Sequence, residues 1–189
     1  MKISDKRDKI IQSALDLIAE RGFHGAPMAE IAEVAGVGAG TIYRYFASKD
    51  ILIEGLFENL KEKINAYLME GYQESKPIRE RLIHLCTRLV DFFTAHPLYF
   101  SFVEQYFHSP FGVSLRRDKL VSGDHDLFIE IFYQGIAQKV LKDLPLFILA
   151  ALTFSPLLSL VRDRNLGLIT ADEELILKCI EASWDGIKK

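Results

Sequence analysis

The sequence predicts an all-α protein of about nine helices, in which a small domain of three helices precedes a larger helical bundle. Apolar residues recur at spacings of three and four along most of the 189 residues, and glycines and prolines separate these stretches. No hairpin signal interrupts them. With 49% hydrophobic and 26% charged residues, the chain has an ordinary globular composition, so a packed core is expected.

The first helix is predicted from residue 5 to about 21, and Gly22 ends it. Its apolar residues share one helical face: Ile10, Ile11, Ala14, Leu15 and Ile18. A second helix, of barely two turns, has Pro27 at its first position and is closed by Gly36. Because so short a helix is not stable alone, it must pack against its neighbours.

Residues 39–46 form the third predicted helix. Ile42 and Phe46 are four residues apart and anchor this helix on the first two, while Gly36 permits the chain to reverse. Two short helices joined by a tight glycine turn are the sequence form of a helix-turn-helix, whose second helix enters the major groove of DNA. The side chains left facing outward are Thr41, Tyr43 and Arg44.

The stretch from Glu30 to Asp50, EIAEVAGVGAGTIYRYFASKD, closely resembles the DNA-binding signature of the TetR family of transcriptional regulators. The resemblance covers residues 7 to about 57. It implies that Thr41 and Tyr43 meet bases and phosphates, that Tyr45 reaches a phosphate, and that Lys49 contacts the DNA backbone. The full set of expected DNA-binding residues is Gly40, Thr41, Tyr43, Arg44, Tyr45 and Lys49.

The chemistry of these residues fits such roles. The Tyr43 ring can lie on a thymine methyl group, and Arg44 can donate two hydrogen bonds to a guanine. Lys49 adds its charge to the free N–H groups at a helix start, and Gly40 lets the backbone approach DNA closely.

This sequence also departs from the family pattern at two helix starts. Ala26 and Pro27 stand where relatives usually have threonine or serine, and Gly38 and Ala39 stand where they usually have serine and lysine. Several phosphate donors are therefore missing. Since non-specific affinity depends on the number of phosphates neutralised, we expect it to be weak.

A long helix of about five turns should follow Ser48, its predicted N-cap. Further helices are separated by breaks at Pro77, 96–97, 109–112, Gly123, 144–145 and 165–167. Thr170 followed by Glu173 predicts a capping box at the start of the last helix. We assign residues 1–48 to a DNA-binding domain, completed by the start of the helix from 49, and residues 49–189 to a ligand-sensing and dimerisation domain.

Aromatic residues interspersed with polar ones are concentrated in the predicted second domain, which favours a pocket for an apolar or planar ligand. The candidate ligand-binding residues are Phe92, Phe93, His96, Phe100, Glu104, His108, Phe128 and Phe132. An aromatic stripe at helical spacing can equally be core. Glu104 and His108 could bind a ligand amine or a metal, or form a solvated ion pair.

The last two predicted helices, about 145–164 and 171–187, are too apolar to be an exposed pair. Two copies could pack as a four-helix bundle about a two-fold axis, which the family resemblance also implies. Such a homodimer would hold two recognition helices about 34 Å apart and predicts a near-palindromic operator.

Other classes of function are less well supported. No nucleophile elbow, zinc-protease motif or phosphate-binding loop occurs, so we expect no enzyme, and we expect no cofactor and no metal site. Residues 144–161 are long enough to consider as a membrane span, but their prolines and hydroxyl residues make them a poor one, and the N-terminus lacks a signal-peptide pattern. We expect a cytoplasmic regulator that responds to a small-molecule effector and binds double-stranded DNA, most simply a repressor. The alternative is a helical module that binds a small molecule or a protein and has lost specific DNA binding.

Overall fold

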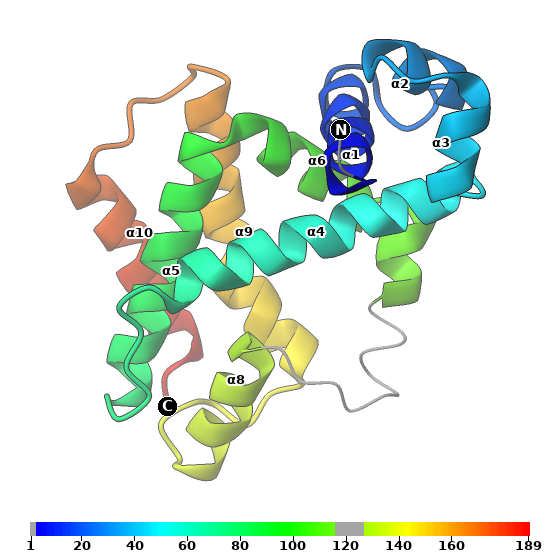
Figure 1. Cartoon of the computed structure of the whole chain (residues 1–189). Coiled ribbons are helices and arrows are strands. Elements are labelled where there is room, and N and C mark those ends of the chain that lie inside the picture. The colour runs from blue at the N-terminus through cyan, green and yellow to red at the C-terminus, as the bar shows by residue number, and fades with distance from the viewer. Residues whose placement is uncertain (1–2, 116–126) are drawn as a thin grey trace. The chain divides into compact units, whose positions relative to one another are not determined.

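The computed structural model describes residues 3–115 and 127–189, which are mostly helical (Figure 1). The helices in chain order are α1 (Ile3–Arg21), α2 (Met28–Val34), α3 (Ala39–Tyr45), α4 (Lys49–Met69), α5 (Ile78–Ala95), α6 (Pro97–Phe107), α8 (Leu127–Ala137), α9 (Leu146–Asn165) and α10 (Glu173–Ile187). Residues 110–115 are also helical. In the described ranges the one β-pairing is an isolated bridge between Leu141 and Lys188. The all-α prediction is confirmed, and the predicted break at Gly123 lies outside the described residues.

The chain forms two compact units. Of the described residues, unit 1 contains 3–63 and 96–115, and unit 2 contains 64–95 and 127–189. Unit 1 therefore extends beyond the predicted three-helix domain and includes α6. The predicted division after residue 48, which concerns the residues that bind DNA, stays a prediction.

In unit 1, α1 packs against α2 and α6, and α2 packs against α3. Their packed surfaces consist of buried apolar side chains, among them Ile10, Ala14, Ile18, Ile31, Ala32, Ile42 and Phe46. Two polar side chains of α6 also reach α1: Ser101 Oγ donates to the carbonyl of Ala19 at 3.0 Å, and Gln105 Nε2 donates to that of Ile18 at 3.1 Å. These bonds connect α6 to the C-terminal end of α1, where the Ile18 carbonyl also accepts from the Gly22 N–H at 2.8 Å.

The turn between α2 and α3 is a glycine C-cap. Gly36 has a φ of +66°, which side chains rarely tolerate. Its N–H bonds to the carbonyl of Glu33 at 3.0 Å, and the N–H of Val37 bonds to that of Ala32 at 2.9 Å, a Schellman motif. Pro27 was predicted at the first helical position, but it is the N-cap residue and α2 begins at Met28. Its extended backbone, with ψ of 148°, explains the difference.

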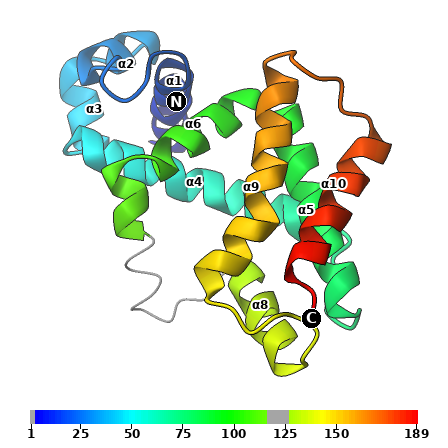
Figure 2. The ribbon, with the colours of Figure 1, turned by 180° about the vertical axis from the view of Figure 1, so that it is seen from behind.

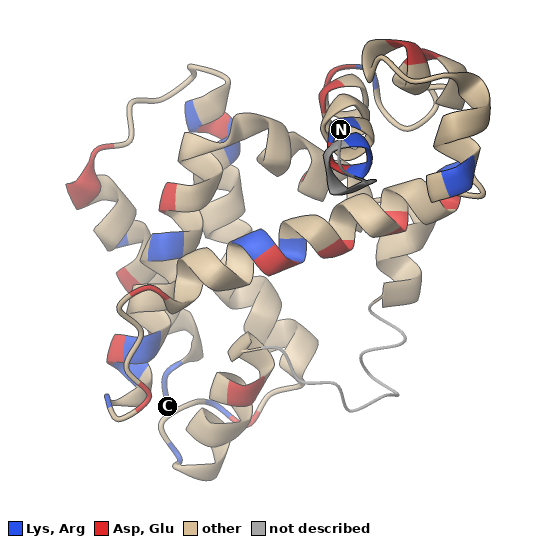
Figure 3. Ribbon diagram, in the orientation of Figure 1, with Lys and Arg blue, Asp and Glu red and all other residues tan. Residues whose placement is uncertain are grey.

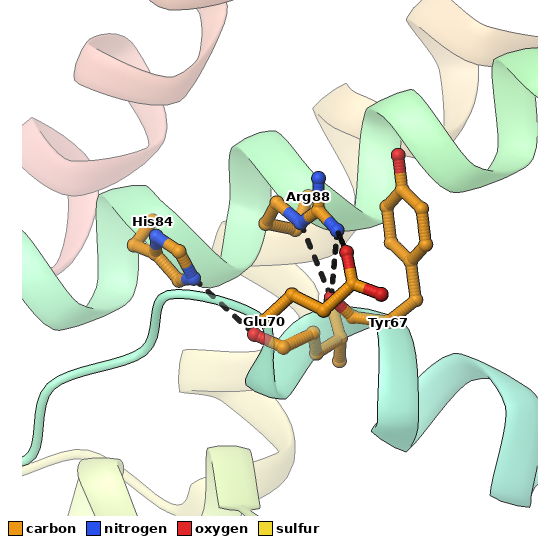
Figure 4. Close-up of polar contacts among 5 residues, drawn as sticks. Tyr67, Glu70, His84 and Arg88 are labelled. Carbon is orange, nitrogen blue, oxygen red and sulfur yellow. Dashed lines mark hydrogen bonds and ion pairs between the residues drawn. The ribbon is translucent and has the colours of Figure 1, made fainter.

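The long helix α4 has the predicted N-cap, because Ser48 Oγ accepts a hydrogen bond from the Ile51 N–H at 3.2 Å. Its last turn, in unit 2, is bonded to α5 (Figure 4). Arg88 donates to the Tyr67 carbonyl at 3.0 and 3.2 Å and pairs with Glu70, while His84 Nε2 lies 3.2 Å from the Leu68 carbonyl. Arg88 and His84 thus contact carbonyl groups in the last turn of α4.

Unit 2 is built around α5, which packs against α8, α9 and α10 (Figure 2). Its buried residues include Leu85, Val90, Ile131, Phe132, Leu149, Leu157, Ile180 and Trp184. The predicted capping box at Thr170 is wrong. Asp172 is the N-cap of α10, and its carboxylate accepts from the Leu175 N–H at 2.9 Å, so the helix begins only at Glu173. An aspartate two residues nearer the helix supplies the acceptor, which a threonine at 170 is too early to provide.

Helix α9 is the one helix in the described ranges whose length and composition would allow it to cross a membrane. Its most apolar window has a mean hydropathy of 1.6, and 28% of that window is buried. Core helices of soluble proteins meet the same criteria. Leu149, Thr153, Leu157, Leu160 and Val161 are buried, which makes α9 part of the core of unit 2.

Candidate functional site

Helix α3 has one buried face and one exposed face. Ile42 is fully buried and Phe46, the residue that ends the helix, is 3% exposed. On the other side Tyr43 is 54% exposed and Arg44 is also exposed, while Thr41 and Tyr45 are half-buried. The aromatic ring of Tyr43 and the guanidinium of Arg44 are thus accessible to a partner, on a helix whose opposite face is packed against the core.

Phe46 is held tightly beneath α3. The Arg7 guanidinium lies 5.5 Å from the centre of its ring. A Cβ placed on Gly55 of α4 would lie 3.1 Å from Phe46 Cε1, so this glycine gives the ring its space. The orientation of α3 therefore depends on α1 and α4 together.

The starts of α2 and α3 are open. Neither N-cap residue, Pro27 or Gly38, makes a side-chain cap bond. A Cβ on Gly40 would meet no atom of the chain within 4 Å. Packing does not require this glycine, which leaves close approach by an external backbone as a reason for it.

Lys49 lies at the N-terminus of α4, and its ammonium donates to the backbone carbonyl of Phe23. Burial lowers the pKa of Lys49, and the neighbouring carboxylate of Asp50 opposes that shift. An ammonium has three donors, so the bond to Phe23 leaves donors for a phosphate.

This arrangement has counterparts among known proteins. A family model described as bacterial regulatory proteins, tetR family, matches residues 10–56, and one described as tetracyclin repressor-like, C-terminal domain, matches residues 77–188. The chain belongs to the TetR family. It is therefore a helix-turn-helix transcriptional regulator, and the family resemblance of its N-terminal segment is confirmed.

Individual relatives match over nearly their full length. An uncharacterized helix-turn-helix regulator of Haemophilus influenzae is 27% identical over 186 residues, covering 98% of this chain and 97% of that protein. A solved TetR family protein from Vibrio parahaemolyticus is 32% identical, with a TM-score of 0.79 and coverage of 97% and 99%. The structure of FadR from Bacillus subtilis in complex with stearoyl-CoA has a TM-score of 0.72 at 20% identity, with coverage of 94% and 95%, and shares the fold.

In this TetR-family chain the predicted ligand-binding residues are divided between the two units. Phe92, Phe93 and Phe132 are buried in unit 2 and Phe128 is half-buried there; His96, Phe100, Glu104 and His108 belong to unit 1. His108 Nδ1 lies 2.7 Å from the backbone carbonyl of Glu104. Among the described residues no group of three or more His, Cys, Asp or Glu is placed to hold a metal ion. The roles of these eight residues stay predictions.

A groove in unit 1 is lined by other residues, namely Asp50, Glu54, Glu58, Tyr106, Pro110, Phe111, Ser114 and Leu115. None of them is among the eight ligand-binding residues predicted from the sequence. Carboxylates at i, i+4 and i+8 on one helix were the available signal. Nothing in the sequence shows that an aromatic wall faces that row.

Proposed function

We propose that this TetR-family regulator is a ligand-responsive repressor, released from a near-palindromic operator when a small, largely apolar or aromatic molecule binds its C-terminal domain. The observation that carries the DNA-binding part is the two-faced helix α3. Tyr43 is more than half exposed on a helix whose opposite side, at Ile42, is wholly buried. Such a helix can enter a major groove without unfolding its own core.

A homodimer through α9 and α10 is part of this proposal. The outer side of α9 has exposed apolar and small residues: Phe147, Ala151, Leu152, Ser155 and Ser159. Small residues allow close helix packing, and Phe147 is 62% exposed, a costly position for a phenylalanine that stays in water. Two copies of this face would form a four-helix interface about a two-fold axis and space the recognition helices one DNA turn apart.

The effector is expected to be apolar because unit 2 is rich in aromatic contacts. Phe154 lies 4.7 Å from Phe128 and 6.3 Å from Phe132, measured between ring centres. The related fold of Bacillus subtilis FadR is described with stearoyl-CoA, which supports a long apolar ligand as one class to test. Because the proposed regulator must meet both the operator DNA and the effector, we propose that it acts in the cytoplasm.

A footprint on the DNA upstream of its own gene tests the proposal. We expect two protected half-sites whose centres are one helical turn apart, about 34 Å, and loss of protection when an extract of apolar metabolites is added. No protection at any upstream site would instead favour the module that has lost specific DNA binding. The helix starts without side-chain caps at Pro27 and Gly38 are the observation behind that second candidate.

A further inference from the structure

Unit 1 contains an open groove of about 480 Å³, and none of the residues that line it is a candidate ligand-binding residue of the sequence prediction. One wall is the first half of α4, where Asp50, Glu54 and Glu58 recur every fourth residue on one face; Figure 3 shows acidic segments along this helix in red. The other wall contains Tyr106, Pro110, Phe111, Ser114 and Leu115 and is apolar except for the hydroxyl groups of Tyr106 and Ser114. The groove therefore combines an acidic wall with an aromatic one.

Among residues 3–115 and 127–189, few ion pairs offset the charge of the acidic wall. Within the described residues no ion pair involves Glu54, and Glu58 has a partner only in Lys61 at 3.3 Å, an exposed pair on the same helix. The carboxylate of Asp50 interacts electrostatically with the ammonium of Lys49, the preceding residue. Exposed pairs of this kind neutralise little charge in water. A row of exposed carboxylates would be an ordinary solvated face if nothing lay opposite.

In this groove, Tyr106 lines the wall opposite the carboxylates of α4. The residue is 5% exposed, and its ring stacks on Phe57 at 4.0 Å with an interplanar angle of 5°. Its hydroxyl makes no hydrogen bond with any described residue. Burial first, and then the charges of Glu54 and Glu58, raise the pKa of Tyr106 to about 12, and all three residues line the groove. The hydroxyl oxygen itself is not enclosed by the chain, so a polar group of a ligand in the groove can reach it.

We propose that this groove binds an amphipathic organic cation, with its positive centre between Glu54, Glu58 and the Tyr106 hydroxyl and its apolar body against Phe111. Carboxylates and aromatic faces both attract a cation, and an anion would be repelled by the same wall. The volume is in the range of small-molecule sites. A bare metal ion fits poorly, because one wall offers it no ligands and the described residues contain no cluster of three metal-binding side chains.

The site lies in the same compact unit as the recognition helix. Its acidic wall belongs to α4, which begins at Lys49, four residues after α3 ends at Tyr45. A cation bound there contacts the helix that anchors α3 through Gly55 and Phe46. Any effect of the cation on DNA affinity rests on the proposed function, whereas the binding itself does not.

Two ions of nearly equal shape and opposite charge test the proposal. Tetraphenylphosphonium and tetraphenylborate are titrated separately into the full chain by calorimetry, without DNA. We expect the cation to bind once per chain and the anion to bind at least about tenfold more weakly. Equal binding of the two ions would overturn the proposal, since it would indicate a merely apolar site.

Variants locate the site. Glu54→Gln combined with Glu58→Gln is expected to weaken cation binding about tenfold, and Glu62→Gln, on the same helix outside the groove, to leave it unchanged. Unchanged binding to the double variant contradicts the proposal. With the unmodified chain, nuclear magnetic resonance shifts caused by the cation should centre on Tyr106 and Phe111, and shifts confined to unit 2 would also overturn it. A chain that binds no cation but still protects its operator refutes only this inference.

Discussion

The side-chain amide of Gln105 donates a hydrogen bond to the backbone carbonyl of Ile18, 3.1 Å away, and so connects α6 to the end of α1. The same amide lies 3.3 Å from Ser101 Oγ, which donates to Ala19. Helix α6 thus stabilises the first helix of the DNA-binding segment by specific polar bonds as well as by packing. The bond between Gln105 and Ile18 joins two parts of unit 1 that are 87 positions apart in the sequence.

Replacing Gln105 by alanine is expected to lower the free energy of unfolding by about 1 kcal/mol, the usual value of a partly buried hydrogen bond. Urea denaturation followed by circular dichroism measures this. Gln12→Ala is the matched control, because the Gln12 amide bonds to Asp16 on an exposed surface at 2.9 Å. Equal losses for the two variants would mean that the contact between α6 and α1 contributes no specific stability.

Phe46→Ala tests the anchor of the recognition helix. The ring is 3% exposed, and its removal leaves a cavity between α3 and α4, so the expected loss is roughly 3 kcal/mol or more. Val34→Ala, at a position 55% exposed in α2, should change stability by less than about 0.5 kcal/mol. Thermal unfolding of both variants gives the comparison. A Phe46→Ala protein that remains folded and binds DNA normally would show that the anchor lies elsewhere.

Tyr43→Ala and Thr41→Ala test base contact. Neither side chain is part of the core, so thermal stability should be unchanged, while specific DNA affinity should fall by about 1–3 kcal/mol, or about five- to 150-fold. Mobility shifts with specific and with random duplexes, at one salt concentration, separate the effects. Leu98→Ala, 47% exposed on α6, serves as a control that leaves both affinities unaltered. An undiminished specific shift for Tyr43→Ala would remove its proposed role.

The sequence predicted helices well where periodicity and caps agree, as at Ser48 before α4. It predicted the start of the last helix wrongly, because Thr170 and Asp172 are both good capping residues and their spacing to Glu173 alone does not decide between them. The buried Ile42 and the exposed Tyr43 followed directly from helical periodicity.

Helical periodicity and capping signals do not predict which helices, distant in sequence, pack against one another. The bonds from Ser101 and Gln105 to α1 join segments more than eighty residues apart, and no local pattern encodes that pairing. For the same reason the sequence does not identify the acidic row of α4 as the wall of a groove, since the facing Tyr106 is known only from the tertiary structure. The eight residues predicted to bind a ligand were chosen because aromatic and polar residues are concentrated in that part of the sequence. Such a composition does not determine to which of the two units each residue belongs.

Gly40 and Gly186 form a natural pair of test sites. A Cβ at either position would meet no atom of the chain within 4 Å, and both glycines are inside helices. Alanine should therefore stabilise the fold at each site by about 0.5–1 kcal/mol through helix propensity. Only Gly40→Ala should weaken specific DNA binding, because only that Cβ would stand between α3 and the duplex. Equal DNA affinity for the two variants would show that Gly40 is not needed for close approach.

The proposed homodimer is tested on the outer side of α9. Truncation before Thr170 should yield monomers, but it also removes Trp184, which is 7% exposed, from the core of unit 2. Leu152→Glu is a milder change, since this residue is 39% exposed in the single chain and its carboxylate would stay hydrated in a monomer. Burying two such charges about a two-fold axis is costly, so we expect sedimentation to show monomers and the operator affinity to fall. Leu168→Glu, 69% exposed in the segment between α9 and α10, places the same charge beyond the proposed helix face and should leave the dimer intact. If Leu152→Glu still sediments as a dimer, the two copies meet through a different surface, and the spacing of the recognition helices must be derived again from that surface.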